Sequence, residues 1–342
     1  MLEFAQQLAY LHAKGDQVIL VSSGAIAAGR ELLGHPHVER GMSAKQMFAA
    51  VGQVQLMHIW RELLGIFDIP IGQVLLTRAD FSHRKSYLNA RDTLFCMLQH
   101  GIMPIINEND TVATKEIRVG DNDNLAALVA SLVGADRLIL LTDQEGLFTA
   151  DPRLNPEAQL IPVVKNIDEG IFALAKGSST TLGTGGMTTK IEAAHIAAQS
   201  GIPTVVASSA RPHVLIDIAQ GQQIGTIFLT DITPRESRKR WLLSEKRQGE
   251  IHVDDGAAAQ ISHHGASLLP CGVMHTVQPF GRGDIVHVID PQSKSIAVGI
   301  TQYSAAEIDQ LLGSHSTGIE DILGYTYGHE VIHRTNMTRI KP

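Results

Sequence analysis

The sequence predicts an α/β fold, in which helices cover both faces of a mostly parallel sheet, followed by a small β-rich domain. Up to Thr230, helical patterns alternate with short apolar runs, as expected when a parallel sheet is buried on both faces. The rhythm changes after Pro234, where short apolar runs are interrupted by glycines and no long amphipathic helix dominates.

The first predicted element is a helix over Leu2–Ala13, which ends at Gly15. Leu2, Ala5, Leu8, Ala9 and Leu11 fall near one face of this helix, the spacing of an amphipathic segment. The predicted strands that follow are Val18–Ser22, Ile71–Thr77, Ile102–Ile106, Arg137–Thr142, Pro203–Ala207 and Thr226–Leu229. The predicted helices between them are Ser43–Leu64, Leu88–Gln99, Leu125–Val133 and Met187–Gln199. Ligands of such sheets bind beyond the carboxyl ends of the strands, so we expect the site there.

Three consecutive parts are expected: a first domain over residues 1–233, a basic linker over 234–248 and a β-rich domain over 249–335. The basic residues of the linker most simply form a solvated segment, and an arm that contacts phosphate groups is the alternative. These basic residues are Arg235, Arg238, Lys239 and Arg240. The apolar runs that predict the last domain are Ile251–Val253, Ser267–Leu269, Ile285–Ile289 and Ile296–Ile300.

The composition suits a globular protein and argues against several classes of function. With 342 residues, of which 44% are hydrophobic and 18% charged, the chain can build one large or two modest domains. A net charge of −7 gives no general reason to expect nucleic acid or an anionic membrane as a partner. No apolar run approaches the roughly 18 residues of a membrane span, and no leader sequence is recognisable.

The cysteines favour a reducing compartment. Cys96 and Cys271 are the two cysteines of the chain, and their apolar surroundings predict two small buried side chains. Their number excludes a disulfide framework, and no Cys/His spacing predicts a zinc site, so we expect no metal-ligating residues. A cytoplasmic location follows as an expectation.

The first candidate functional segment is Ser22–Gly29, at the end of the first predicted strand. Small residues and glycine there let a ligand approach the backbone, whose N–H groups can hold an anion. Taken alone this signal is weak, because Gly/Ser turns are common.

Two clusters of carboxylate and carboxamide side chains follow. Asn107–Asp110 comes after the strand that ends at Ile106, and Gly120–Asn124 opens the helix Leu125–Val133. An exposed turn and a helix cap are the simpler interpretations. The functional interpretation of the first cluster is a pocket for a substrate with an ammonium and a carboxylate group, with Asp110 pairing with the cation. The second has more polar side chains than a cap requires, which favours cationic or metal-linked partners.

A glycine-rich loop, Gly183–Gly186, precedes the last long helix, whose first turn contains Lys190. Free N–H groups, the positive end of a helix dipole and a lysine charge together form a phosphate cradle. The Gly-to-Lys spacing differs from that of a P-loop, and no dinucleotide-binding glycine motif follows the first strand. A flexible loop without a ligand is the alternative. Another long turn, Thr142–Arg153, follows the fourth strand.

In this order, Ser22–Gly29, Asn107–Asp110, Gly120–Asn124, Thr142–Arg153 and Gly183–Lys190 resemble the motifs of the glutamate 5-kinases, in the amino-acid-kinase superfamily. The β-rich segment resembles the PUA domain that bacterial members often append. The resemblance covers essentially the whole chain. Single motifs would indicate only the superfamily, whereas the two polar clusters together point to glutamate.

The resemblance implies that the chain transfers the γ-phosphoryl group of ATP, with Mg²⁺, to the side-chain carboxylate of L-glutamate. The product is L-glutamyl 5-phosphate, in the first step of proline biosynthesis. By the same resemblance, Ser23, Asp110 and Asn122 bind glutamate, Lys190 stabilises charge on the transferring phosphoryl group, and Asp123 orients the lysines. The implied ATP-binding residues are Thr142, Asp143, Thr184, Gly185, Gly186, Met187, Thr188, Thr189 and Lys190.

The resemblance also implies feedback inhibition by proline, a homo-oligomer and glutamyl phosphate reductase as a partner. It is interrupted at the start of the chain. Members of the family begin with a strand that ends in Lys-x-Gly-Ser/Thr and meets the ATP phosphates, whereas this sequence begins in the helix expected after that strand. We therefore expect the opening strand to be missing, and the chain as written to phosphorylate glutamate poorly.

Two alternatives stay open at this stage. One is a catalytically impaired, truncated form, which the missing strand suggests. The other is an RNA-binding protein, because PUA domains occur in RNA-modifying enzymes. From Glu250 to Pro342 the sequence has ten acidic and five basic residues, a net charge of −5, whereas nucleic-acid binders usually have a basic surface. We therefore expect no nucleic-acid partner.

Overall fold

The computed structural model describes residues 1–37, 41–113, 121–175, 186–245 and 247–340. It divides into two compact units, Met1–Pro234 and Arg235–Pro342. None of the described helices is long and apolar enough to cross a membrane.

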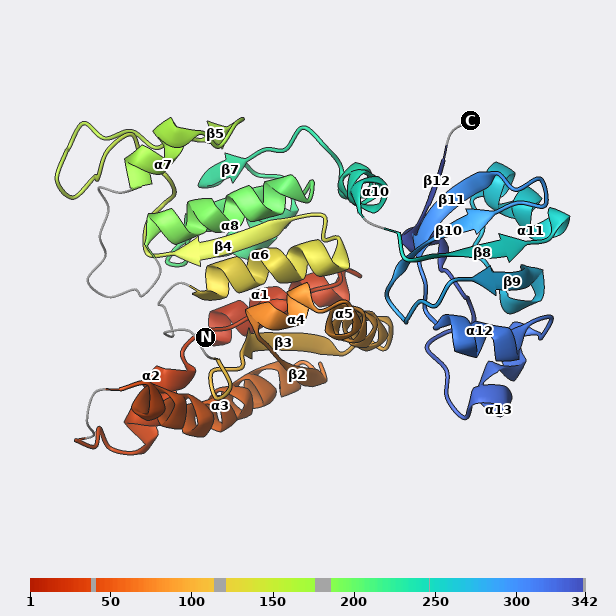
Figure 1. Cartoon of the computed structure of the whole chain (residues 1–342). Helices are drawn as coiled ribbons and strands as arrows, with labels where there is room; N and C mark the ends of the chain where they lie inside the picture. The colour runs from red at the N-terminus through yellow and green to blue at the C-terminus, as the bar shows by residue number, and fades with distance from the viewer. Residues whose placement is uncertain (38–40, 114–120, 176–185, 246, 341–342) are drawn as a thin grey trace. The chain divides into compact units, whose positions relative to one another are not determined.

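The first unit alternates helices with short strands, as the sequence predicts (Figure 1). Its strands are β1 (Leu20–Val21), β2 (Ile71–Leu76), β3 (Met103–Glu108), β4 (Leu138–Thr142), β5 (Val163–Val164), β6 (Thr204–Ser208) and β7 (Thr226–Phe228). Its helices are α1 (Leu2–Ala13), α2 (Ala25–Leu32), α3 (Met42–Gly65), α4 (Arg78–Ser82), α5 (Arg84–Gln99), α6 (Asp121–Val133), α7 (Glu169–Ala175), α8 (Met187–Gln199) and α9 (Val214–Ala219).

The strands of this unit form two sheets. In the first, β3 lies between β1 and β2 and pairs with both in parallel. The second has the order β4-β6-β7-β5, with parallel pairs at both ends and an antiparallel pair between β6 and β7. Within the described residues, β1 and β4 are each paired on one side only. The predicted mostly parallel arrangement is confirmed, although the strands are divided between two sheets.

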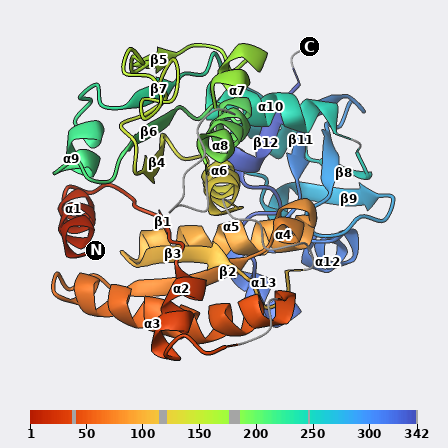
Figure 2. The ribbon, with the colours of Figure 1, turned by 90° about the vertical axis from the view of Figure 1, so that its left-hand side faces the viewer.

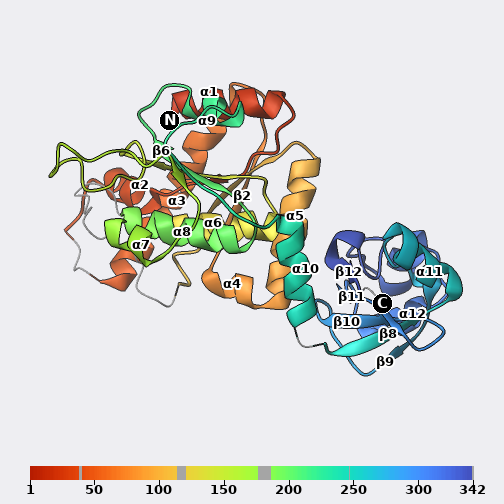
Figure 3. The ribbon, with the colours of Figure 1, turned by 90° about the horizontal axis from the view of Figure 1, so that it is seen from above.

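Helices cover both faces of the strands (Figures 2 and 3). On one face, α1, α3 and α9 share a core that includes Leu8, Leu56 and Val214. On the other, α5 and α6 pack against β3 through Leu94, Val129 and Ile106, and α8 packs with α6 over the second sheet. Helices α1 and α9 lie side by side in both views, and the backbone N–H of Leu215 donates to Oε1 of Gln7 (2.8 Å).

Helices α2 and α3 approach until their backbones touch. A Cβ atom added to Gly29 would lie 2.0 Å from the carbonyl oxygen of Phe48, and one added to Gly52 would lie 1.8 Å from that of Ala25. Real Cβ atoms do not come this close to backbone oxygens, so only glycine fits at either position. Because α2 begins directly after the turn that ends β1, this contact fixes that turn relative to α3.

The second unit contains a five-stranded sheet in the order β12-β11-β10-β8-β9. Its strands are β8 (Gly249–Val253), β9 (Val273–Val277), β10 (Ile285–Ile289), β11 (Ser295–Ile300) and β12 (Met337–Arg339). Its helices are α10 (Pro234–Ser244), α11 (Asp255–Ala259), α12 (Ala305–Leu311) and α13 (Ile319–Leu323). Helix α10 begins at Pro234, the last residue of the first unit. One core joins the sheet to the helices through Ile251, Val286 and Ile308. The predicted β-rich character of this part is confirmed.

A carboxylate stabilises the start of α12. Glu307 accepts hydrogen bonds from the backbone N–H and hydroxyl of Ser304 and from the hydroxyl of Tyr325. Burial raises the pKa of Glu307, but the hydrogen bonds from Ser304 and Tyr325 outweigh it and hold the pKa below its ordinary value. The bond to Glu307 also raises the pKa of Tyr325 to about 12.

The prediction that both cysteines are buried is wrong, because Cys96 and Cys271 are exposed. Cys96 is on α5, where the buried side chains Leu88, Arg91 and Leu94 recur at intervals of three residues. It comes two residues after Leu94, about 200° further around the helix, and therefore lies outside the buried stripe. Apolar neighbours in the sequence did not imply burial.

Other differences concern short elements. Most of residues 234–248, which the sequence predicts to be a linker, forms α10, and Pro234 suits its first helical position. The segment after β1 is the helix α2, which its alanines favour. The run Ser267–Leu269 contributes an isolated bridge between Leu268 and Ile332 rather than a strand.

We predict that Gly52→Ala destabilises the first unit by about 1–3 kcal/mol, because the added methyl group forces α2 and α3 apart. Gly65→Ala, in the same helix, is the matched control, since a Cβ there meets nothing within 4 Å. It should be neutral or stabilising by up to about 1 kcal/mol. Urea denaturation measures both free energies of unfolding, and equal midpoints for the two variants would contradict the contact.

Candidate active site

The turn after β1 exposes one serine and buries another. The backbone N–H of Ser22 donates to the carbonyl oxygen of Ile106 (2.9 Å), and its Oγ accepts a hydrogen bond from Nε1 of Trp60 (3.1 Å). Ser22 is buried, whereas Ser23 is exposed. Gly24 follows with a φ of +107°, a conformation that favours glycine, and caps α2. The buried serine therefore anchors the turn, and Ser23 is accessible to a ligand.

Three carboxamides form a continuous chain beside this turn, called the amide chain below: Gln53 on α3, Asn107 at the end of β3 and Asn122 in the first turn of α6. Nδ2 of Asn107 donates to Oε1 of Gln53 (2.8 Å). Nδ2 of Asn122 donates to Oδ1 of Asn107 (3.0 Å), which also accepts from the backbone N–H of Glu108 (2.9 Å). The chain joins three elements at the carboxyl end of β3.

Asp110 lies at the same end of the sheet. The polar cluster Asn107–Asp110 begins inside β3, which extends through Glu108, two residues beyond the predicted strand. The backbone N–H of Asn109 donates to the carbonyl oxygen of Leu76 (3.0 Å), which holds the turn against β2. Asp110 is half-buried. Asp110 therefore follows the carboxyl end of β3, in a turn that is bonded to the end of β2.

Asp123, Thr189 and Lys190 form a second cluster, in the first turns of α6 and α8. Nζ of Lys190 is 3.0 Å from Oδ2 of Asp123, and these side chains are 7% and 16% exposed. Oγ1 of Thr189 donates to the same Oδ2 (2.7 Å). A buried ammonium group needs an opposite charge, which Asp123 supplies. Because helix N-termini favour anions, a lysine there is suited to hold a phosphate group.

The remaining predicted nucleotide-binding residues lie at the start of α8 and the end of β4. Gly186 caps α8, Met187 is buried, and Thr188 is half-buried in the first helical turn. Thr142 ends β4, and its hydroxyl donates to Oδ1 of Asp143 (3.1 Å). Thr184 and Gly185 lie outside the described residues.

An ion pair shapes the long turn after β4. The guanidinium of Arg153 donates to both carboxylate oxygens of Asp151, at 3.0 and 2.7 Å. The hydrogen bonds from Arg153 lower the pKa of Asp151 from its ordinary value, so this carboxylate stays charged. The pair therefore links two residues within the turn that follows Asp143.

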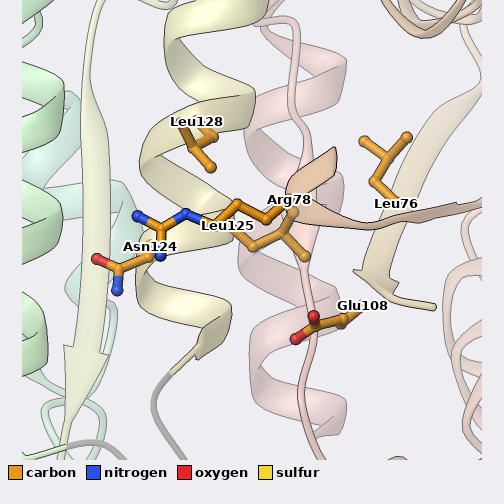
Figure 4. A pocket seen from close by; sticks show the side chains of 6 residues that line it. All are labelled: Leu76, Arg78, Glu108, Asn124, Leu125 and Leu128. Atoms are coloured by element: carbon orange, nitrogen blue, oxygen red, sulfur yellow. The ribbon is translucent and has the colours of Figure 1, made fainter. Parts of the chain in front are cut away.

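A small pocket of about 10 Å³ lies between β2, β3 and α6 (Figure 4). Its lining residues are Leu76, Arg78, Glu108, Asn124, Leu125 and Leu128. In this view the side chain of Arg78 passes in front of Leu125, and its guanidinium points toward the carboxamide of Asn124. A pocket of this size holds about one water molecule, so it is too small for a substrate.

The structure therefore brings Asn122, Asp123, Thr189 and Lys190 together and places Ser23 and Asp110 at the carboxyl ends of neighbouring strands. Analysis of the sequence missed Gln53. It follows Ala49 by four residues and precedes Leu56 by three, so it occupies a core position of α3. A carboxamide in phase with the buried stripe of a helix is a signal for a polar contact inside the fold.

Comparisons with known proteins give the families that the chain resembles. The amino acid kinase family matches residues 1–208, and the PUA domain matches residues 249–323. The chain is 49% identical over 337 residues to a glutamate 5-kinase of Enterobacter sp. (strain 638), covering 98% of this chain and 92% of that protein. A glutamate 5-kinase of Escherichia fergusonii is 48% identical with the same coverage. A solved UMP kinase from Bacillus anthracis is 15% identical with a TM-score of 0.43, covering 68% of this chain and 87% of that one.

Proposed function

The chain belongs to the amino acid kinase family and, within it, to the glutamate 5-kinases, and we propose that it phosphorylates the side-chain carboxylate of L-glutamate with ATP. The product is L-glutamyl 5-phosphate, formed in the first step of proline biosynthesis. The observation that carries the proposal is the adjacency of Asn122 and Asp123. One joins the amide chain at the strand ends, and the other pairs with Lys190 at the start of α8.

The chemistry needs positioning and positive charge rather than a base. A carboxylate is already a nucleophile at neutral pH, and its oxygen attacks the γ-phosphorus while the bond to the β-phosphate oxygen breaks and ADP leaves. The obstacle is the approach of an anion to a polyanion. Groups that hold both reactants in line and stabilise charge on the transferring oxygens supply most of the catalysis available.

In this proposal the carboxyl ends of β1 and β3 hold glutamate. The half-buried Asp110 pairs with its ammonium group, and Asn122 offers a carboxamide oxygen beside it. The exposed Ser23 and the backbone after it face the substrate at the end of β1. Accessibility and position support these three assignments.

The nucleotide lies over the start of α8 in this proposal, with Thr142, Asp143 and residues 184–190 around it. Lys190 stabilises charge on the transferring phosphoryl group, and Asp123 holds its ammonium in place. Mg²⁺ enters with ATP, since at such sites it keeps several waters and is bound mainly through substrate phosphates. The described donor set fits this role, because the carboxylate of Asp123 is already engaged by Lys190 and Thr189.

We also propose the wider properties that the family resemblance implies. These are feedback inhibition by proline at the glutamate site, a homo-oligomeric state, glutamyl phosphate reductase as a partner, and a cytoplasmic location. Incubation of the chain with ATP, Mg²⁺ and glutamate in hydroxylamine tests the activity itself, because an acyl phosphate is trapped as a hydroxamate. If no hydroxamate forms, or if its amount does not depend on glutamate, the proposal is contradicted.

Replacement of the site lysine tests its catalytic role. We predict that Lys190→Ala lowers kcat by about 10³-fold, as loss of comparable cationic groups does in phosphoryl transfer. Lys165→Ala is the matched control, because Lys165 is exposed and lies outside the site. Steady-state kinetics with thermal unfolding of both variants separates chemistry from stability. A change confined to KM for ATP would show that Lys190 binds only the ground state.

Binding of the ammonium group of glutamate should depend on Asp110. We predict that Asp110→Asn raises KM for glutamate by about 10- to 100-fold, the loss expected for one hydrogen bond to a charged group. KM for ATP should stay within about twofold. The control is Asp136→Asn, an exposed carboxylate just before β4 and thus at the opposite end of the strands. Equal weakening for both substrates would favour a structural role for the Asn107–Asp110 turn.

Removal of the chain after Gln248 tests the second unit. We predict that the shortened chain keeps most of its glutamate phosphorylation, because every residue assigned to the site lies before Ile191. The same hydroxamate assay measures this, with circular dichroism to confirm folding. A folded but inactive product would show that the β-rich domain completes the site.

A further inference from the structure

We propose that Gln53 is a positioning residue for glutamate, which it orients through Asn107 and Asn122 without contacting the substrate. The inference rests on the proposed function and adds a residue from α3, an element that holds none of the predicted site residues. Three hydrogen bonds support it: those between Gln53 and Asn107, between Asn107 and Asn122, and between Asn107 and the backbone of Glu108.

The direction of each hydrogen bond follows from the one before it. A carboxamide donates only through nitrogen and accepts only through oxygen. Oε1 of Gln53 accepts from Asn107, so Asn107 must direct its nitrogen to α3 and its oxygen to α6. Asn122 then has to present its nitrogen to Asn107. Its own oxygen accepts no hydrogen bond from the described part of the chain and is left for a donor.

This orientation of the Asn122 carboxamide suits the ammonium group of the substrate. An ammonium group is a donor only, so it needs oxygens around it. With its nitrogen bonded to Asn107, Asn122 keeps its oxygen as an acceptor that complements Asp110, whereas a reversed Asn122 would present N–H donors to the ammonium group. The acceptor oxygen of Gln53, together with the N–H of Glu108, opposes that reversal.

The burial of Gln53 argues that stability alone does not explain why a glutamine occupies this position. Gln53 is 8% exposed, yet its Nε2 is fully buried and has no hydrogen-bond partner in the described part of the chain. An unsatisfied buried donor is unfavourable, and an apolar residue in the same stripe of α3 would avoid it. A site where a local rule is broken in this way is often a functional one.

The test replaces Gln53 by Met, which is also unbranched but lacks a strong acceptor. We expect Gln53→Met to raise KM for glutamate by about 3- to 10-fold, the effect of one hydrogen bond, because Glu108 still holds Asn107 from the other side. KM for ATP and kcat should change by less than about twofold, which is smaller than the change expected in KM for glutamate. Gln53→Leu serves the same purpose if the Met variant does not fold.

Two further variants separate positioning from packing. Gln53→Glu keeps an acceptor oxygen in either protonation state, so it should restore most of the affinity for glutamate that Gln53→Met loses. Gln55→Leu, two residues along α3 and without a contact to the amide chain, should change nothing. Equal losses in the Met and Glu variants would overturn the proposal.

A double-mutant cycle gives the decisive measurement. In the background of Asn122→Ala, Gln53→Met should add less than about a twofold change in KM for glutamate, since its effect passes through Asn122. Additive effects would show that Gln53 acts on the fold in general, and an unchanged KM in the single variant would also refute the role. Failure of the proposed function looks different: the unaltered chain then forms no hydroxamate and binds no glutamate in calorimetry.

Discussion

The ion pair between Asp123 and Lys190 is the interaction on which the rest of the site depends. The side chain of Lys190 is 7% exposed, and a buried ammonium group is strongly unfavourable without an opposite charge beside it. The pair also joins the first turns of α6 and α8, two helices that are far apart in the sequence. With both helix N-termini held together, their dipoles and the lysine act on the same space.

The neighbouring residue, Asn122, connects this ion pair to the site proposed for glutamate. Asn122 belongs to a network of neutral carboxamides, whereas Asp123 belongs to a network of charges. Successive residues in a first helical turn point in different directions, so one turn of α6 can serve two ligands. In the proposed site, the geometry of a single helix would thereby set the distance between the two reactants.

The sequence predicted the features that depend on local pattern. Buried strands and the helices that follow them produce signals within a few residues. The division into two sheets was not predictable in this way, because β1 and β5 have only two residues each and pairing depends on distant partners. Gln53 was missed for a related reason: its partner Asn107 is far along the chain, and only the fold shows that a polar side chain inside an apolar stripe is hydrogen-bonded. Cys96 shows the reverse error, since apolar neighbours do not reveal which side of a helix faces inward.

The contact between Gly29 and Gly52 has a consequence for how this enzyme can diversify. With no side chains between them, α2 and α3 have no layer that could repack to absorb a shift, so the two helices move as one block. The turn with Ser23 leads into one helix of that block, and Gln53 is part of the other. A lineage could therefore alter ligand preference by exchanging individual side chains, but it could not widen the site by sliding one helix without carrying the amide chain along. At this end of the sheet, the close backbone contact therefore limits which changes of shape evolution can reach.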